Sequence, residues 1–91
     1  MGRRSARLDQ LTDDMPGVFD VHTEDGAVHR LDLNKRTAAS FASEQTVYPE
    51  VQQVQLLILA TCRVGAQMVM LIDRGAQGVR FTRRTTAVVQ Y

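Results

Sequence analysis

Three residues of this 91-residue chain have side chains that bind transition metals well: His22, His29 and Cys62. A structural zinc site usually takes four Cys or His ligands at short spacings, so this set is too small. The alternation of polar and apolar residues around the histidines also predicts that His22 points out of a sheet and His29 into it. We therefore expect no metal site and no cofactor.

The other candidates for acid–base or nucleophilic chemistry occupy positions where a structural role is expected. Cys62 follows an apolar run, where a thiol is more often a small hydrophobic side chain than a nucleophile. The carboxylate pair at residues 13–14 falls at the end of a predicted helix, and the pair at 24–25 falls in a predicted turn. We expect that the chain is not an enzyme.

The charges are unevenly distributed along the chain, which is expected either where the two halves neutralise each other once the strands pair or where the protein binds an anionic partner. Residues 1–50 carry six cations and nine anions, a net charge of −3, whereas residues 51–91 carry five cations and one anion, a net charge of +4. Side chains of a strand alternate between its two faces, so Arg80 and Arg84, four residues apart, are expected to share the outer face. They would form an arginine stripe able to contact phosphates. The predicted anionic-partner contacts are Arg74, Arg80, Arg83 and Arg84. Nucleic-acid binding is the alternative function, and it is weakened because Phe81 and Tyr91 are expected on the opposite face, away from the arginines.

An apolar surplus favours a protein partner instead. Residues 51–64 contain an unbroken apolar run, and a second run spans 68–72. A helix is possible for the first run, but Gly65 between the two runs favours a hairpin of strands. A strand that is apolar on both faces must be covered on both, by the barrel interior and by an N-terminal helix or a second copy of the chain. The favoured function is a non-catalytic protein-binding module or homo-oligomer that uses residues 54–72, with predicted contacts Leu57, Leu59 and Met70.

The elements that would position these residues are mostly strands. Residues 79–91 alternate strictly, which predicts a strand with an apolar inner face and a basic, threonine-rich outer face. Arg83 interrupts the inner face, so a bulge near residues 82–84 should turn it outward. The predicted inner face comprises Val79, Phe81, Thr85, Ala87, Val89 and Tyr91.

Two turns set the register of the N-terminal half. A three-residue loop at 24–26 with a bulge pairs Val21 with His29, Phe19 with Leu31 and Asp20 with Arg30. By the same logic, a three-residue loop at 34–36 continues the meander and pairs Thr37 with Leu33, Ala39 with Leu31 and Phe41 with His29. Residues 42–50 are predicted to be a loop.

The chain should form a single small domain. Residues 3–15 place Leu8, Leu11 and Met15 at helical spacing before a Pro-Gly stop, which predicts a short helix in an N-terminal arm of residues 1–16. Residues 17–91 are expected to form one mainly β domain, an antiparallel barrel or rolled sheet of about six strands. The start of the chain has no secretory signal, no run is long enough to cross a bilayer, and the single thiol favours a reducing compartment, so we expect a cytoplasmic protein with no membrane contact.

Three segments combine turn and strand residues in a recognisable order: Leu31-Asp32-Leu33-Asn34-Lys35-Arg36-Thr37, Cys62-Arg63-Val64-Gly65-Ala66-Gln67-Met68 and Arg83-Arg84-Thr85-Thr86-Ala87-Val88-Val89. Together they resemble a pattern found in small uncharacterised β-rich proteins of actinobacteria and their phages. The resemblance covers most of the chain from Val18 onward and rests on turn and strand signatures. It implies a small β-rich domain in a phage or mobile-element setting, and it carries over no functional residue.

Overall fold

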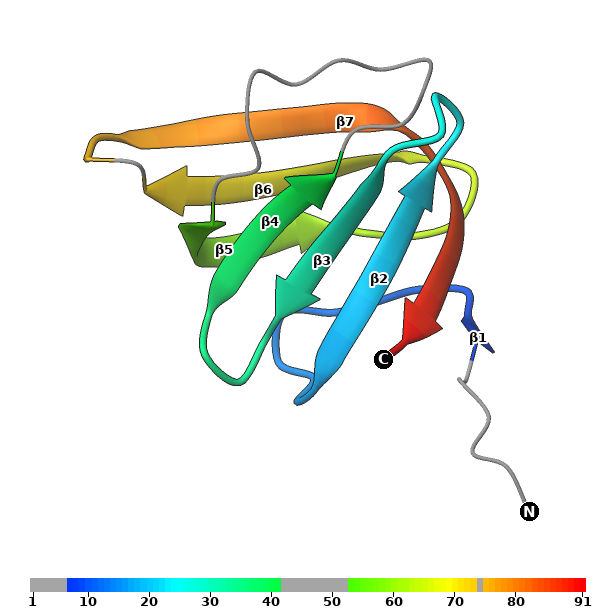
Figure 1. The fold of residues 1–91 in the computed structure, drawn as a ribbon, viewed down its shortest axis with the longest axis horizontal. Helices are drawn as coiled ribbons and strands as arrows, with labels where there is room; N and C mark the ends of the chain where they lie inside the picture. Colours follow the sequence, from blue (N-terminus) through cyan, green and yellow to red (C-terminus); the bar gives the residue numbers. More distant parts are fainter. Residues whose placement is uncertain (1–6, 42–52, 74) are drawn as a thin grey trace.

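Antiparallel strands close into a six-stranded barrel with one additional short strand at its side (Figure 1). The computed structural model describes residues 7–41, 53–73 and 75–91. The strands in chain order are β1 (Arg7–Leu8), β2 (Val18–Thr23), β3 (Val28–Asp32), β4 (Thr37–Phe41), β5 (Gln53–Thr61), β6 (Gln67–Asp73) and β7 (Gln77–Gln90). Neighbouring strands follow the order β1-β7-β2-β3-β4-β5-β6, and β6 also pairs with β7, which closes the ring. The predicted mainly β antiparallel barrel is confirmed, as is the hairpin of strands in its second half.

β7 belongs to both halves of the barrel. Its first half pairs with β6 and its second half pairs with β2, and the ribbon bends between them (Figure 1). The barrel therefore consists of one side built from β2, β3, β4 and the end of β7, and another built from β5, β6 and the start of β7. A strand shared in this way needs extra residues at the corner, because a regular ladder cannot turn sharply.

The β2–β3 hairpin has the predicted register. Val21 lies opposite His29 and Phe19 opposite Leu31, so these side chains share the inner face. Gly26 adopts a positive φ of 85°, which glycine tolerates without steric cost, and its N–H donates to the Thr23 carbonyl at 2.9 Å. The three-residue loop with a bulge is confirmed.

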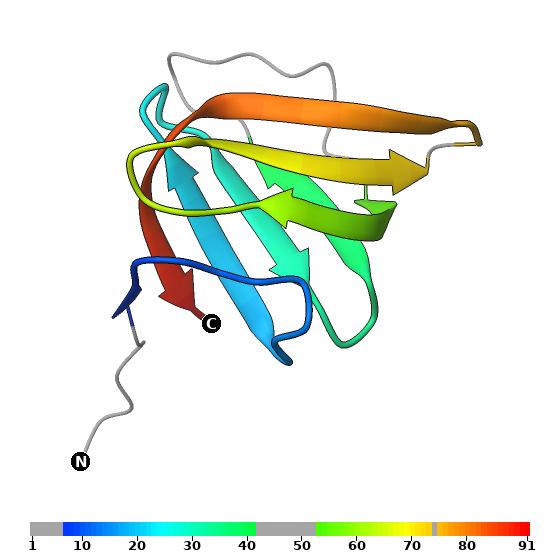
Figure 2. The same cartoon turned by 180° about the vertical axis from the view of Figure 1, so that it is seen from behind.

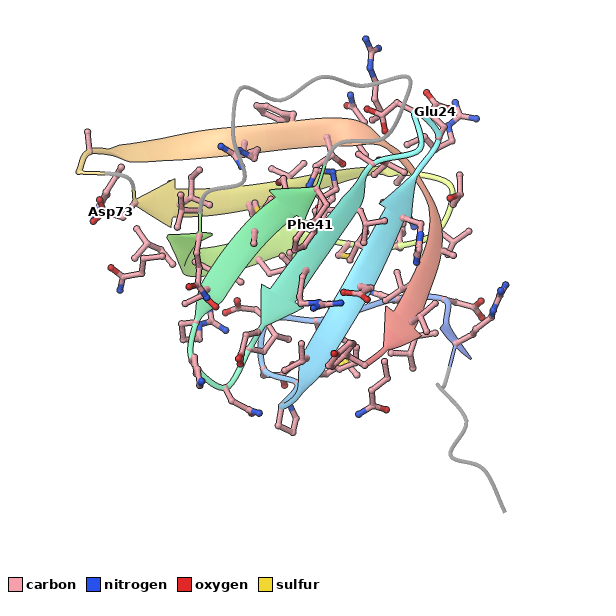
Figure 3. The ribbon with its side chains drawn as sticks, in the orientation of Figure 1. Glu24, Phe41 and Asp73 are labelled. Carbon is pink, nitrogen blue, oxygen red and sulfur yellow. The ribbon has the colours of Figure 1, made fainter. Side chains whose placement is uncertain are left out.

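The predicted register of the next hairpin is wrong by one residue. Leu31 pairs with Ala38 and His29 with Ser40, because the turn holds four residues, 33–36, and not three. The Asp32 carboxylate causes this longer turn by accepting hydrogen bonds from the backbone N–H groups of residues 34 and 35 at 3.0 and 2.8 Å. A one-residue slip moves every side chain of the strand to the other face, so Phe41 lies outside. Its ring contacts Arg30 there, 5.6 Å from the guanidinium carbon (Figure 3).

The predicted faces of β7 are largely reversed. Val79 and Phe81 are predicted to lie inside, yet they are 57% and 64% exposed, whereas Thr82 and Val88, which are not in the predicted inner face, are buried. Thr85 is buried as predicted. The inward residues recur at a spacing of three because the ladder shifts register twice, once opposite residues 67–69 and once opposite residues 22–23. The bulge predicted near residues 82–84 is confirmed, and it turns Arg83 outward.

The predicted N-terminal helix is wrong for the described part of residues 3–15. From residue 7 the chain forms β1 and then crosses below the β5 side of the barrel (Figure 2). Leu11 donates its N–H to the Cys62 carbonyl at 2.8 Å, and Val64 donates to the Asp9 carbonyl at 2.9 Å. These long-range bonds occupy backbone groups that a helix would use internally. The apolar residues of this segment still contribute to the core, because Leu11 is buried in it and Leu8 and Met15 pack against the core cluster.

The barrel interior is apolar at one end and polar at the other. The apolar cluster comprises Leu11, Phe19, Val21, Leu31, Leu33, Ala38, Val54, Leu56, Leu59, Cys62, Met68, Met70, Ile72 and Val88. Buried polar side chains gather towards the β2–β3 turn: Thr23, His29, Ser40, Thr82 and Thr85. The loop predicted at 42–50 lies outside the described residues. No helix long and apolar enough to cross a bilayer occurs in the described ranges.

An ion pair and its hydrogen bonds connect the N-terminal segment to a bulge in β5. Leu57 is an extra residue in the ladder between β5 and β6, which leaves backbone groups of β5 without strand partners. The Leu57 carbonyl accepts a hydrogen bond from Arg36 Nη2 at 2.9 Å, and the Leu59 N–H donates to Asp13 Oδ1 at 2.7 Å. Asp13 and Arg36 also form an ion pair at 2.6 Å. The Arg36 guanidinium and the Leu59 N–H hold the pKa of the Asp13 carboxyl below its usual range.

Replacing Asp13 with Ala should therefore lower the free energy of unfolding by about 1–2 kcal/mol at pH 7, because the bulge loses its acceptor. The stabilisation is present above the unfolded-state pKa of about 3.9 and disappears as the pH falls through the lower folded-state pKa, so the variant and the native chain should converge in acid. Urea unfolding monitored by circular dichroism measures both effects.

The matched control is Asp14→Ala. Asp14 is exposed, and its carboxylate accepts a hydrogen bond from the nearby Thr12 hydroxyl at 2.7 Å. Its loss should change the unfolding free energy by less than about 0.5 kcal/mol. Equal destabilisation by the two substitutions would contradict a specific stabilising role of the Asp13 carboxylate.

Candidate functional site

The most chemically reactive pair lies inside the barrel. His29 Nδ1 and Ser40 Oγ are 2.8 Å apart, the distance at which a histidine base would activate a hydroxyl nucleophile. His29 is only 3% exposed and Ser40 only 8%, so neither faces solvent. Burial lowers the pKa of His29, Asp25 opposes this effect, and Arg80 adds to it. The ring is therefore held in its neutral form at neutral pH, in a polar part of the core.

The other reactive groups do not assemble into a site. Burial raises the pKa of the Cys62 thiol to about 12, so it remains protonated and packs as a core side chain. No group of three or more His, Cys, Asp or Glu residues within the described ranges is placed to hold a metal ion. His22 lies on the outer face of β2, away from His29.

The predicted arginine stripe is not assembled on one face. Arg80 pairs with buried Met70, so its side chain projects from the inner face of β7 and is half-buried. Arg83 sits in the bulge and Arg84 on the outer face, and both are exposed. Arg74 lies outside the described residues. The predicted arginines thus leave β7 in different directions.

The predicted apolar contacts are mostly core residues. Leu59 and Met70 lie opposite each other on the inner face and belong to the apolar cluster, so neither is presented to a partner in this structure. Leu57 occupies the bulge of β5 and is half-buried. The reason is the alternation of side chains along a strand, because the residues next to Leu59 and Met70 point outward.

Five outward-pointing apolar residues of β5, β6 and β7 form a surface that we call the apolar face: Ile58, Val69, Leu71, Val79 and Phe81. Val69 and Leu71 in its middle strand are partly buried. Two cross-strand rows build it, one of Ile58, Leu71 and Val79, and one of Val69 and Phe81. Paired residues of antiparallel strands share a face, so these side chains lie side by side. Ile58 is 49% exposed, and Val79 and Phe81 are more than half exposed.

Two hollows flank Phe81 along β7. One has a volume of about 460 Å³ and is lined by Ile72, Ala76, Gln77, Gly78, Val79, Arg80 and Phe81. The other has a volume of about 300 Å³ and is lined by Asp25, Gln67, Phe81, Thr82 and Arg83. The Phe81 ring therefore stands between two recesses, with Arg80 at one and Arg83 at the other.

The Thr82 hydroxyl holds the backbone that places Phe81 outside. Thr82 Oγ1 accepts a hydrogen bond from the Met68 N–H at 3.1 Å and donates to the Arg83 carbonyl at 2.7 Å. These bonds replace ladder bonds lost at the bulge. The sequence contained a signal for this arrangement, because Thr82, Thr85 and Val88 recur at the spacing of three that two bulges produce.

Comparison of the chain with protein-family models, with curated proteins and with solved structures found no match.

The buried histidine predicts a pH-dependent stability. The pKa of His29 is lower in the folded protein than in the unfolded chain, where a histidine has a pKa of about 6.5. Below that pH the unfolded chain therefore binds the proton more readily than the folded protein does. The free energy of unfolding should fall as the pH drops from 7 to 5.5. Nuclear magnetic resonance titration of the His29 ring should give a pKa below 6.5. In the His29→Gln variant this part of the pH dependence should be absent, while His22→Gln retains it. A ring that titrates above 6.5 would contradict the assignment.

Proposed function

We propose that this chain is a non-catalytic binding module that recognises a protein through the apolar face. The observation that carries the proposal is the set of five apolar side chains brought together by β5, β6 and β7, of which Ile58, Val79 and Phe81 remain well exposed. Contiguous exposed apolar residues rimmed by polar ones are typical of protein interaction sites. The burial of His29, Ser40 and Cys62 favours binding over catalysis.

The surroundings of the apolar face support a protein partner. Glutamine and threonine side chains border it at both ends of the three strands. Gln55 and Gln77 lie opposite Asp73 at one end, and at the other end Gln67 lies opposite Arg84 and Thr61 opposite Val69. Protein interfaces commonly have an apolar centre with a polar, solvent-exposed rim. A protruding aromatic such as Phe81 is the kind of anchor that supplies much of the binding energy.

The resemblance to proteins of actinobacteria and their phages supports a setting for this function. In a phage or mobile element the partner would be a host protein in the cytoplasm. This part of the proposal rests on the three segments that carry the resemblance.

Single-stranded nucleic acid is the second candidate ligand. It is favoured by one observation, that Phe81 lies on the same face as Arg84, so a base could stack beside a cation. Binding of a labelled oligonucleotide, measured by fluorescence anisotropy, would then fall steeply with salt concentration. The aliphatic rows of the apolar face favour a protein, because Ile58 and Leu71 offer neither stacking nor hydrogen bonds to a base.

The double variant Val79→Ser, Phe81→Ser tests the proposed function. A bead-displayed library of random peptides of about twelve residues, an extended span of about 40 Å, is incubated with the labelled protein. The native chain should enrich a set of peptides, and the variant should bind them at least about tenfold more weakly, because it loses the aromatic anchor. The midpoint of urea unfolding should shift little, since both side chains are mostly in solvent.

The matched control is Phe41→Ser, Tyr91→Ser, which removes two exposed rings from the other side of the barrel, where both flank Arg30. This variant should bind the enriched peptides as tightly as the native chain. Absence of any enriched peptide, or equal loss in the two variants, would refute binding through the apolar face.

A further inference from the structure

We infer that the partner is an acidic protein segment with apolar side chains, laid along the outer surface of β5, β6 and β7. The inference rests on the proposed function and specifies the chemistry of its partner. It follows from the charges around the apolar face, from the size of that face and from the exclusion of two other occupants.

Surplus positive charge surrounds the apolar face. All five of its residues come from the half of the chain with a net charge of +4, residues 51–91. Arg63, in the turn between β5 and β6, is exposed at the same end of the ribbon as Arg83 and Arg84. Within the described part of the chain, these three side chains form no ion pair. Their charges are available to an incoming carboxylate.

Carboxylates of the chain itself offset part of this charge, and they lie at opposite ends of the surface formed by β5, β6 and β7. Figure 3 shows Asp73 at the end of β6 and Glu24 at the β2–β3 turn. Glu24 donates its backbone N–H to the Arg84 carbonyl at 2.9 Å, so the two residues are neighbours. Asp73 accepts a hydrogen bond from the Gly75 N–H at 2.9 Å, which ties it to its own turn.

Asp25 also lines the hollow beside Arg83, and its carboxylate accepts hydrogen bonds from the Thr23 hydroxyl and the Ala27 N–H within its own turn. Three arginines, Arg63, Arg83 and Arg84, therefore face two carboxylates, Glu24 and Asp25, which leaves a surplus of one positive charge at this end.

The apolar face has the length of a short extended segment. From the row of Gln67 and Arg84 to the row of Asp73 and Gln77, β6 advances six residues, about 20 Å. Three strands give a width of about 14 Å, hence a flat area of about 300 Å². A stable protein dimer needs about 800 Å² from each partner, so the face suits a peptide segment better than a second copy. A second copy would also bring two positive surfaces together.

Nucleic acid is a poorer match to the same surface. Phosphates lie at regular intervals along a strand, whereas the three arginines gather at one end of the apolar face and aliphatic side chains occupy the rest. An acidic segment with alternating apolar residues matches both parts, since carboxylates can reach the arginines while apolar side chains cover Ile58, Leu71 and Val79.

The charge-reversal variant Arg83→Glu, Arg84→Glu provides the test, with the same bead-displayed peptide library as probe. Peptides enriched by the native chain should contain more Asp and Glu than the starting library, together with apolar residues. The variant should bind them about tenfold more weakly and should enrich Lys- and Arg-containing peptides instead, because paired rim charges govern which partner is accepted. Glu24→Gln removes the neighbouring counter-charge and should tighten binding of the acidic peptides.

The matched control is Arg7→Glu, Lys35→Glu, which makes the same change in net charge at exposed sites elsewhere on the barrel. It should leave the acidic preference unchanged. Enriched peptides that are neutral or basic, or that are equally weakened by the control, would overturn the acidic partner while leaving the proposed function intact. Absence of enrichment would overturn both. Tighter binding of a twenty-nucleotide oligothymidine, or self-association abolished by Phe81→Ser in sedimentation experiments, would replace the acidic segment with nucleic acid or with a second copy.

Discussion

β7 can join both halves of the barrel because an extra residue between Thr82 and Arg84 lets the strand change direction. The Thr82 hydroxyl satisfies the backbone groups that this bulge removes from the ladder, so the bend costs few hydrogen bonds. Each extra residue also reverses which side chains face inward from that point on. The bulge therefore closes the barrel and at the same time puts Phe81 on its exterior.

In one of the bulges of β5, the backbone groups find their hydrogen-bond partners in a different way. There the bulge at Leu57 is filled from outside its own hairpin, by the side chains of Asp13 and Arg36. One residue precedes the barrel and the other lies in the β3–β4 turn, so the ion pair links three regions that are distant in sequence. This arrangement explains why the N-terminal segment lies extended below the barrel, with Leu11 inserted into the core.

With these constraints met, the inward side chains fill the small barrel and the outward side of β5, β6 and β7 remains uncovered by any described helix. The apolar residues on that side do not serve the core of the chain. Their position at the surface, beside exposed arginines, is the physical basis of the proposed binding role of this side. The opposite side of the barrel differs, since Arg30 there is paired with Asp20 and covered by the rings of Phe41 and Tyr91.

The sequence by itself determined the class of the fold and the register of its first hairpin, because the alternation of residues and a glycine suited to a positive φ are local properties. It also showed that the cations outnumber the anions in the second half of the chain and that this half contains two apolar runs. Only the tertiary structure decided which side chains face out, because that depends on two bulges in β7, two in β5 and a turn lengthened by Asp32. A register shift of one residue leaves the composition of a strand unchanged and exchanges its faces. For this reason Leu59 and Met70 belong to the core, while their neighbours Ile58 and Leu71 form the surface.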